Sequence, residues 1–170
     1  MTVLFILSLT LGAAAIPLKR AYDEQRFHAA VRGVIERLAL AQNLMLIADT
    51  DVTVFVEYSE KNKQLEVSLE ADKPLERRWA KIAGEKQGFP SIGSFKFEQS
   101  NQKKLELHYA LGNMSQGTLQ LFPPDGLSLA VQEGYKIYLP GYPAPCPFSG
   151  KQDEDFLKKS ELLYPASLKK

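Results

Sequence analysis

The sequence predicts an α+β fold in which one long N-terminal helix packs against antiparallel β-sheets. Three features carry this prediction: an uncharged apolar run at residues 1–18, an amphipathic helical pattern at residues 19–48, and short β-branched or aromatic segments from Val52 onward. About seven short strands after a single helix favour antiparallel pairing over a repeated strand-helix-strand array. The 170-residue chain has room for one globular domain at residues 19–150, followed by a charged C-terminal tail at residues 151–170.

The first 18 residues form a segment directed to a membrane. A buried core helix is disfavoured, since the run shows no solvent face. A cleaved export signal fits the small residues Ala13 to Ala15 but lacks a preceding basic region. A retained transmembrane helix fits the hydropathy, although a span needs roughly 20 residues. We expect this segment to serve as a membrane and filament helix through Val3, Leu4, Ile6, Leu7, Leu9, Leu11, Gly12, Ala13, Ile16 and Pro17.

Residues 19–48 alternate apolar steps of three and four, the signature of a helix with one buried stripe. Charged side chains occupy the other positions, among them Arg32, Glu36 and Arg37. The second half of this helix is apolar on more than one face, so the domain is expected to wrap around it. The residues that extend the apolar surface there are Leu40, Leu44, Leu46 and Ile47. Since membrane helices tolerate proline, the two helical pieces are expected to form one rod that is kinked near Pro17. The stripe that should contact the sheet consists of Phe27, Val31, Val34, Leu38, Ala41 and Met45.

The remaining segments alternate or are β-branched and are bounded by Gly, Asn, Ser or Pro, as strands are. The stretch from Leu75 to Ile82, which contains Trp79, is charged and fits either a short helix or an ordered loop. The expected strands are 52–58, 64–70, 94–99, 104–110, 117–122, 127–131 and 135–139.

Composition and motifs point away from catalysis. Lys and Arg number 21 against 20 Asp and Glu, so no global field favours nucleic acid. The sequence carries no nucleophile elbow, phosphate-binding loop, zinc-binding helix motif or dinucleotide fingerprint. Asp49 and Asp51 have the chemistry to hold a hard cation such as calcium, but a role in ending the helix before Val52 is favoured. We therefore expect a protein that is not an enzyme, has no cofactor or nucleotide, and binds other proteins.

Several segments together resemble type IV pilin-like proteins. The apolar run ends in Ala-Ala-Ala-Ile-Pro17 and continues into a helix with Phe27-His-Ala-Ala-Val31 and a strand Val52-Thr-Val54. The turn Phe122-Pro123-Pro-Asp125-Gly126 looks like the F-x-P-D-G turn of the same group. The chain is most similar to the minor pseudopilin of the H class in type II secretion and its FimT-like relatives. The resemblance implies a pilin-like fold.

The start of the sequence departs from this family. A prepilin has a basic leader, a glycine before the cleavage point and a phenylalanine-led opening with a glutamate. If Pro17 is the family's helix proline, these would lie upstream of Met1. We expect a longer reading frame that begins upstream of Met1. The alternative is a diverged member that the prepilin peptidase does not process.

The resemblance implies a structural function. Such a subunit is anchored in the bacterial inner membrane by a single span, with its globular domain in the periplasm, and then packs into a short filament that serves protein secretion. Its implied partners are other pseudopilins, the inner membrane and exported proteins, with energy from a separate cytoplasmic motor. Two alternatives stay open: a type IV pilus minor pilin, marked by a local basic patch for DNA, and an exported β-rich binding protein with a cleaved signal peptide.

Overall fold

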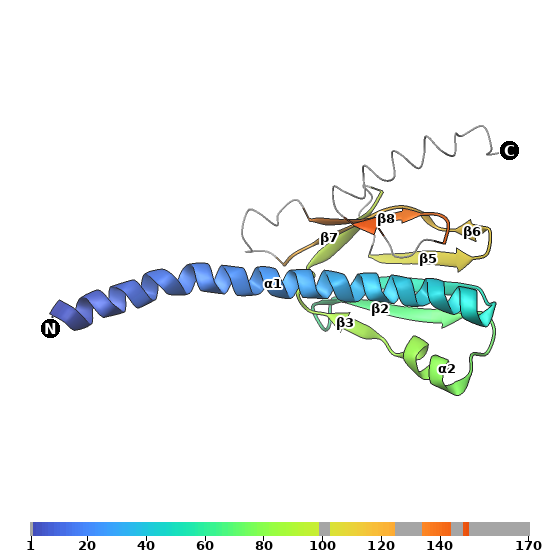
Figure 1. The fold of residues 1–170 in the computed structure, drawn as a ribbon, viewed down its shortest axis with the longest axis horizontal. Helices are drawn as coiled ribbons and strands as arrows, with labels where there is room; N and C mark the ends of the chain where they lie inside the picture. Colours follow the sequence, from blue (N-terminus) through green and yellow to red (C-terminus); the bar gives the residue numbers. More distant parts are fainter. Residues whose placement is uncertain (1, 99–102, 125–133, 144–147, 150–170) are drawn as a thin grey trace.

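The N-terminal helix extends well beyond the sheets that cover its second half (Figure 1). The computed structural model describes residues 2–98, 103–124, 134–143 and 148–149, with residues 2–16, 148 and 149 as backbone alone. Helix α1 runs without interruption from Thr2 to Ala48 and contains Pro17. The predicted joining of two helical pieces into one rod is thus confirmed, and Figure 1 shows a gentle bend instead of a sharp kink.

Two antiparallel sheets follow the helix in the described part of the chain. The first has the strand order β3-β2-β1-β5-β6 and the second the order β4-β7-β8-β9. The strands of the first are β1 (Val52–Ser59), β2 (Gln64–Ala71), β3 (Gln87–Phe89), β5 (Lys104–Ala110) and β6 (Asn113–Met114). The strands of the second are β4 (Ser94–Phe97), β7 (Gln116–Phe122), β8 (Tyr135–Pro140) and β9 (Phe148–Ser149).

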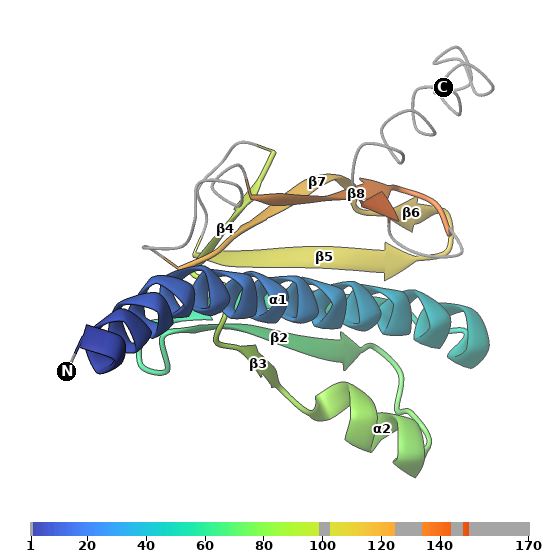
Figure 2. The ribbon, with the colours of Figure 1, turned by 60° about the vertical axis from the view of Figure 1, so that its left-hand side comes forward.

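The core lies between α1 and the inner faces of these sheets (Figure 2). Alternate residues of β1, β2 and β5 are buried, as period-two burial of one sheet face requires. Opposite them lies the whole predicted helix stripe, which is buried: Phe27, Val31, Val34, Leu38, Ala41 and Met45. Antiparallel sheet packed on an N-terminal helix is therefore confirmed.

Short elements complete the fold where the sequence was ambiguous or silent. The charged stretch around Trp79 forms helix α2, Arg77–Gly84, which lies near the C-terminal end of α1 (Figure 2). The two- and three-residue strands β3, β6 and β9 were not predicted, because pieces this short carry no periodicity. The fourth strand ends at Phe97, since Glu98 has a positive φ of 49° that leaves the extended region.

Two expectations about α1 need correction. The expected wrapping of the second half is confirmed only in part, because Leu44 is buried and Leu40 packs partly buried against the core, but Leu46 is 48% exposed and Ile47 is 69% exposed. Arg37, which was assigned to the solvent face, is only 8% exposed. The α2–β3 segment packs on the side of α1 that carries Arg37 and buries this residue. Leu46 and Ile47 lie on other sides of the helix and stay exposed.

Several predicted features fall outside the described residues. They are the side chains of the apolar run through Ile16, the strand 127–131, Asp125 and Gly126 of the turn, and the tail 151–170. Among the residues that the structure describes, no helix is long and apolar enough to cross a membrane.

Candidate functional site

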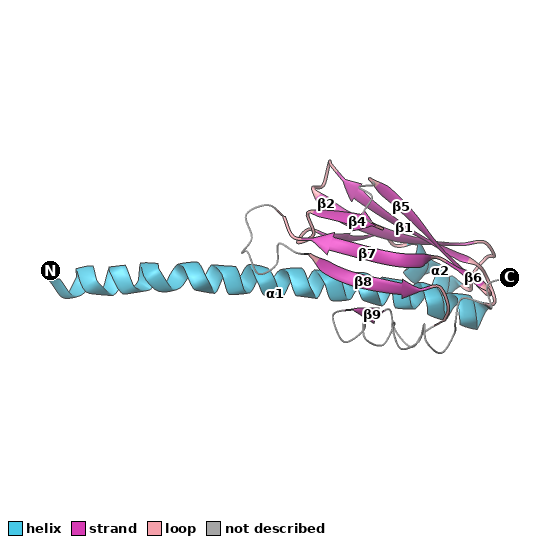
Figure 3. Cartoon of the chain, turned by 90° about the horizontal axis from the view of Figure 1, so that it is seen from above, coloured by secondary structure: helices cyan, strands magenta, loops and turns pink. Residues whose placement is uncertain are grey.

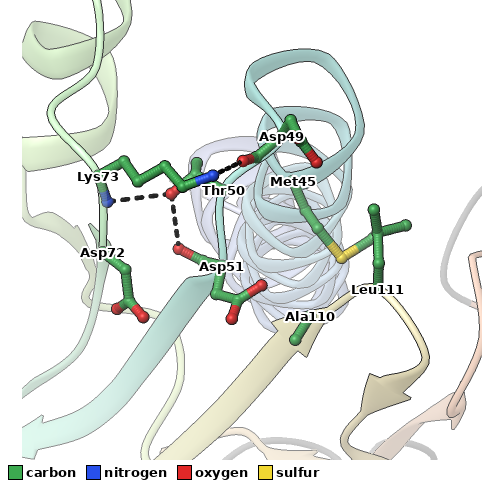
Figure 4. Close-up of a pocket in the computed structure, with 8 residues that line it drawn as sticks. All are labelled: Met45, Asp49, Thr50, Asp51, Asp72, Lys73, Ala110 and Leu111. Atoms are coloured by element: carbon green, nitrogen blue, oxygen red, sulfur yellow. Dashed lines mark hydrogen bonds between the residues drawn. The ribbon is translucent and has the colours of Figure 1, made fainter.

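A small cavity lies where α1 ends and β1 begins (Figure 4). Its volume is about 260 Å³, and its walls come from the last turn of α1, the connection between α1 and β1, the residues just after β2 and the end of β5. The lining residues are Met45, Asp49, Thr50, Asp51, Asp72, Lys73, Ala110 and Leu111.

Hydrogen bonds in this cavity hold the helix end in place. Asp49 has a positive φ of 46°, the left-handed conformation in which helices commonly end. The Lys73 ammonium donates to the Asp49 carbonyl oxygen at 2.6 Å, and the Lys73 backbone N–H donates to Thr50 Oγ1 at 3.0 Å. A cation at the C-terminal end of a helix also interacts favourably with the helix dipole. The favoured role of Asp49 and Asp51, turning the chain from helix to strand, is therefore confirmed.

The metal interpretation of these aspartates finds no support in the described residues. No group of three or more His, Cys, Asp or Glu side chains there is arranged to hold a metal ion. The cationic Lys73 at the cavity wall further weakens the attraction for a second cation. The hydrogen bonds that line this cavity therefore belong to the end of α1.

The outward face of α1 is a second candidate surface. Leu18, Tyr22 and Ile47 are 73%, 60% and 69% exposed. At 3.6 residues per turn they lie within about 40° of one another around the helix, on the side opposite Leu38. The Arg26 guanidinium lies 5.8 Å from the Tyr22 ring centroid, within cation–π range. This outward stripe is thus a set of three exposed apolar side chains on α1, of which only Ile47 lies on the part of the helix that packs against the core.

Arg37 is the residue whose role the sequence did not reveal. Its guanidinium donates three hydrogen bonds, to Gln87 Oε1 at 2.6 Å, to the Ile82 carbonyl at 2.8 Å and to the Glu85 carbonyl at 3.0 Å. The two carbonyls belong to the C-terminal end of α2, where the helix dipole is negative. Arg37 therefore acts as a C-terminal cap for α2 that is supplied by another helix.

A glycine on the same side of α1 admits the neighbouring strand. A Cβ at Gly33 would lie 2.5 Å from Cε1 of the buried Phe89 in β3. Gly33 thus lets β3 approach the helix closely, one turn before Arg37 caps α2. Gly33 and Arg37 thus join the α2–β3 segment to α1, in addition to the packing of that segment on β2. Helical periodicity alone predicts neither role.

The described part of the predicted turn is also held from two sides. The Gly93 N–H donates to the Phe122 carbonyl at 2.9 Å, and a Cβ at Gly93 would lie 2.6 Å from the Cα of Pro124. The Lys96 ammonium lies 5.2 Å from the Phe122 ring centroid. Phe122 and Pro123 are half-buried, so in the described part this motif closes one end of the second sheet.

No family model matches the chain, and no curated protein and no solved structure shows a match.

Proposed function

We propose that this protein is a pilin-like structural subunit, a minor pseudopilin of a type II secretion filament, that acts through assembly with other subunits. The observation that carries the proposal is the shape of α1. Residues 17–22 of this helix are exposed, while the stripe from Phe27 to Met45 is buried under the sheets (Figure 3). A helix that is half stalk and half core is what a membrane-anchored, filament-forming subunit requires.

The composition of the stalk supports the same function. Its sequence from Val3 to Ile16 is apolar and includes Gly12 and Ala13 to Ala15. Apolar side chains suit the bilayer, and small residues let helices approach one another closely once the subunit leaves it. The outward stripe of Leu18 and Tyr22 continues this surface beyond the apolar run. The proposed subunit would exchange lipid contacts for contacts with neighbouring helices along one continuous face.

A type IV pilus minor pilin is the second candidate, and one feature favours it. Helix α2 exposes Arg77, Arg78 and Lys81 and contains no acidic residue, so the near-neutral chain does carry a local basic patch. The two candidates share an architecture and differ in their partners. Affinity purification of the full chain from its own cells, with the co-purified pilin-like proteins identified, separates them.

Cell fractionation tests the anchor. Leu9→Asp places a charge in the middle of the apolar run and should release the protein from the membrane fraction, because a charge there costs about 2.5 to 3.5 kcal/mol on insertion scales. Lys19→Asp, beyond the run, is the matched control and should leave retention unchanged. If wild type is soluble and has lost residues 1–15 by mass spectrometry, the protein is an exported binding protein and the proposal fails.

A further inference from the structure

Helix α2 presents a basic surface to solvent. Trp79 and Ala83 pack against the core, while Arg77, Arg78 and Lys81 are exposed. At 3.6 residues per turn, the three basic side chains lie within about 100° of one another around the helix, on the side opposite Trp79. In the part of the chain that the structure describes, none of the three forms an ion pair. These three side chains, which we call the basic face, are therefore available to an anionic partner.

The position of the two arginines is unfavourable for the helix itself. Both lie in the first turn of α2, where the helix dipole is positive and acidic side chains are favoured. The N-cap residue, Glu76, makes no side-chain capping bond that would offset this charge. Local choices that cost stability commonly mark functional sites. A contact outside the chain thus explains the two arginines better than the stability of α2 does.

The location of α2 makes lipid headgroups an unsuitable partner. Figures 1 and 2 show α2 near the C-terminal end of α1, far from the N-terminal end of that helix. Arg37 holds α2 there through the Ile82 and Glu85 carbonyls. From Pro17 to Arg37 the helix rises about 30 Å at 1.5 Å per residue. A membrane that holds the apolar run is therefore well beyond the screening length of about 10 Å at 0.1 M salt.

The surroundings of the basic face also disfavour duplex nucleic acid. Glu76 and Glu85 directly flank α2, and both are exposed. A phosphate backbone that followed the helix would pass these carboxylates, whereas a compact cluster of carboxylates can contact the basic face between them. Ile82, at the edge of the basic face, is 45% exposed and offers an apolar contact that a protein surface can use. Charge and shape together therefore favour a protein partner.

We propose that the basic face binds a cluster of carboxylates on a different protein, which the proposed function identifies as another pilin-like subunit. Charge complementarity selects this occupant. The described glutamates on the outward side of this chain's own first sheet already interact with Lys104, Asn62 and Gln64, so they are poor candidates for the same role. A contact between two kinds of subunit also suits a minor subunit. The proposal rests on the proposed function and deepens it by giving the chemistry of the partner.

Carbodiimide cross-linking tests this contact, because the reagent joins a lysine amine to a carboxylate in direct contact and forms an amide with loss of water. Membranes from cells that make the full chain are treated, and cross-linked peptides are identified by mass spectrometry. Wild type should give an adduct between Lys81 and an Asp or Glu of another pilin-like protein. R77E/R78E should lower the yield of this adduct about tenfold or more, since it reverses the local charge. R77K/R78K keeps the charge and should keep the adduct.

A folding defect would not explain the expected loss. Glutamates in the first turn interact favourably with the helix dipole, so R77E/R78E should melt at the wild-type temperature or above it. The matched control K61E/K136E reverses two exposed lysines in the β1–β2 turn and on β8. It should leave the yield of the Lys81 adduct unchanged.

Several outcomes would overturn the contact. One is a Lys81 that forms no adduct or is linked only to carboxylates of this chain, such as Glu85. Another is an adduct whose yield is the same in R77E/R78E as in wild type. Loss of retention on duplex DNA in R77E/R78E, without any Lys81 adduct, would assign α2 to nucleic acid instead.

The two proposals fail separately. A chain that co-purifies with pilin-like proteins but forms no Lys81 adduct keeps its proposed function and loses this contact. A charge-dependent Lys81 adduct with a protein that is not pilin-like keeps an acidic protein partner for α2 and loses the filament.

Discussion

Single residues decide how the outlying parts of this molecule are held. Arg37 reaches from α1 to the end of α2, and its charge is balanced by backbone carbonyls and an amide in place of a carboxylate. A buried guanidinium is stable in such a setting because its donors are hydrogen-bonded and the helix dipole favours positive charge there. One side chain of α1 thus holds the end of α2 from more than 40 residues away in sequence, in addition to the packing of α2 and β3 on β2.

Arg37→Met should destabilise the fold. The variant keeps the apolar stem but removes three hydrogen bonds and leaves the carbonyls of Ile82 and Glu85 without this donor. We expect the free energy of unfolding to fall by about 2 to 4 kcal/mol in urea denaturation. Arg32→Met, at an exposed position of the same helix, is the control and should change it by less than about 0.5 kcal/mol. Equal effects of the two substitutions would show that Arg37 does not cap α2.

Glu66 provides a test by pH. Asn62 Nδ2 donates to its carboxylate at 2.7 Å and Gln64 Nε2 at 3.3 Å, and these bonds hold the pKa of Glu66 below its ordinary value. A lowered folded-state pKa means that this carboxylate stabilises the fold above the unfolded pKa and loses that contribution as pH falls through the folded pKa. NMR titration should show the pKa of Glu66 rising in Asn62→Ala. An unchanged pKa would mean that the Asn62 bond is not formed in solution.

At the scale of elements, α1 explains why the fold was largely predictable. The spacing from Phe27 to Met45 predicted which face is buried, and the alternation in Leu65, Val67 and Leu69 predicted which side of β2 faces the core. Both patterns repeat over several turns or residue pairs, so one position in conflict does not hide them.

The features that the sequence did not predict depend on single contacts between distant segments, and such contacts leave no periodic pattern in the sequence. The charged residues near Arg37 in the sequence predict that it lies on the surface, and the low helix propensity of glycine predicts only that Gly33 destabilises the helix. Their roles exist only because β3 and the end of α2 approach from elsewhere in the chain. Leu46 and Ile47 illustrate the reverse case, since apolar residues predict burial but these two remain exposed. The hydrogen bonds at Asp49 were not predicted either, because the donor, Lys73, lies 24 residues later in the sequence, just after β2.

Charged substitutions in the buried stripe of α1 should strongly lower the stability of the fold. Val34→Asp or Leu38→Asp places an unpaired carboxylate where the native side chains are fully buried. We expect a loss of about 3 kcal/mol or more in the free energy of unfolding, read from thermal or urea denaturation. Asn43→Asp, on the exposed side of the same helix, serves as the control. A melting temperature that is unchanged in Leu38→Asp would show that the stripe faces the wrong way.

At the scale of the whole molecule, the exposed N-terminal part of α1 (the stalk) and the packed remainder of the described chain (the head) have different roles. The head is a packed unit in which α1, both sheets and α2 share one core. Residues 17–22 of α1 are exposed outside that core, and the helix continues through Pro17. The exposed segment of α1 acquires a purpose in an assembly, which is the central claim of the proposed function.

Cross-linking from the stalk tests that claim most directly. Tyr22 is 60% exposed on the outward stripe, so Tyr22→Cys in a Cys146→Ser background places one reactive thiol there. A thiol cross-linker applied to cells should produce an adduct in which mass spectrometry identifies a pilin-like protein or a second copy of this chain. The Cys146→Ser parent should give none. A Tyr22→Cys protein that is present at wild-type abundance, reacts with a small maleimide and still forms no such adduct would contradict the account.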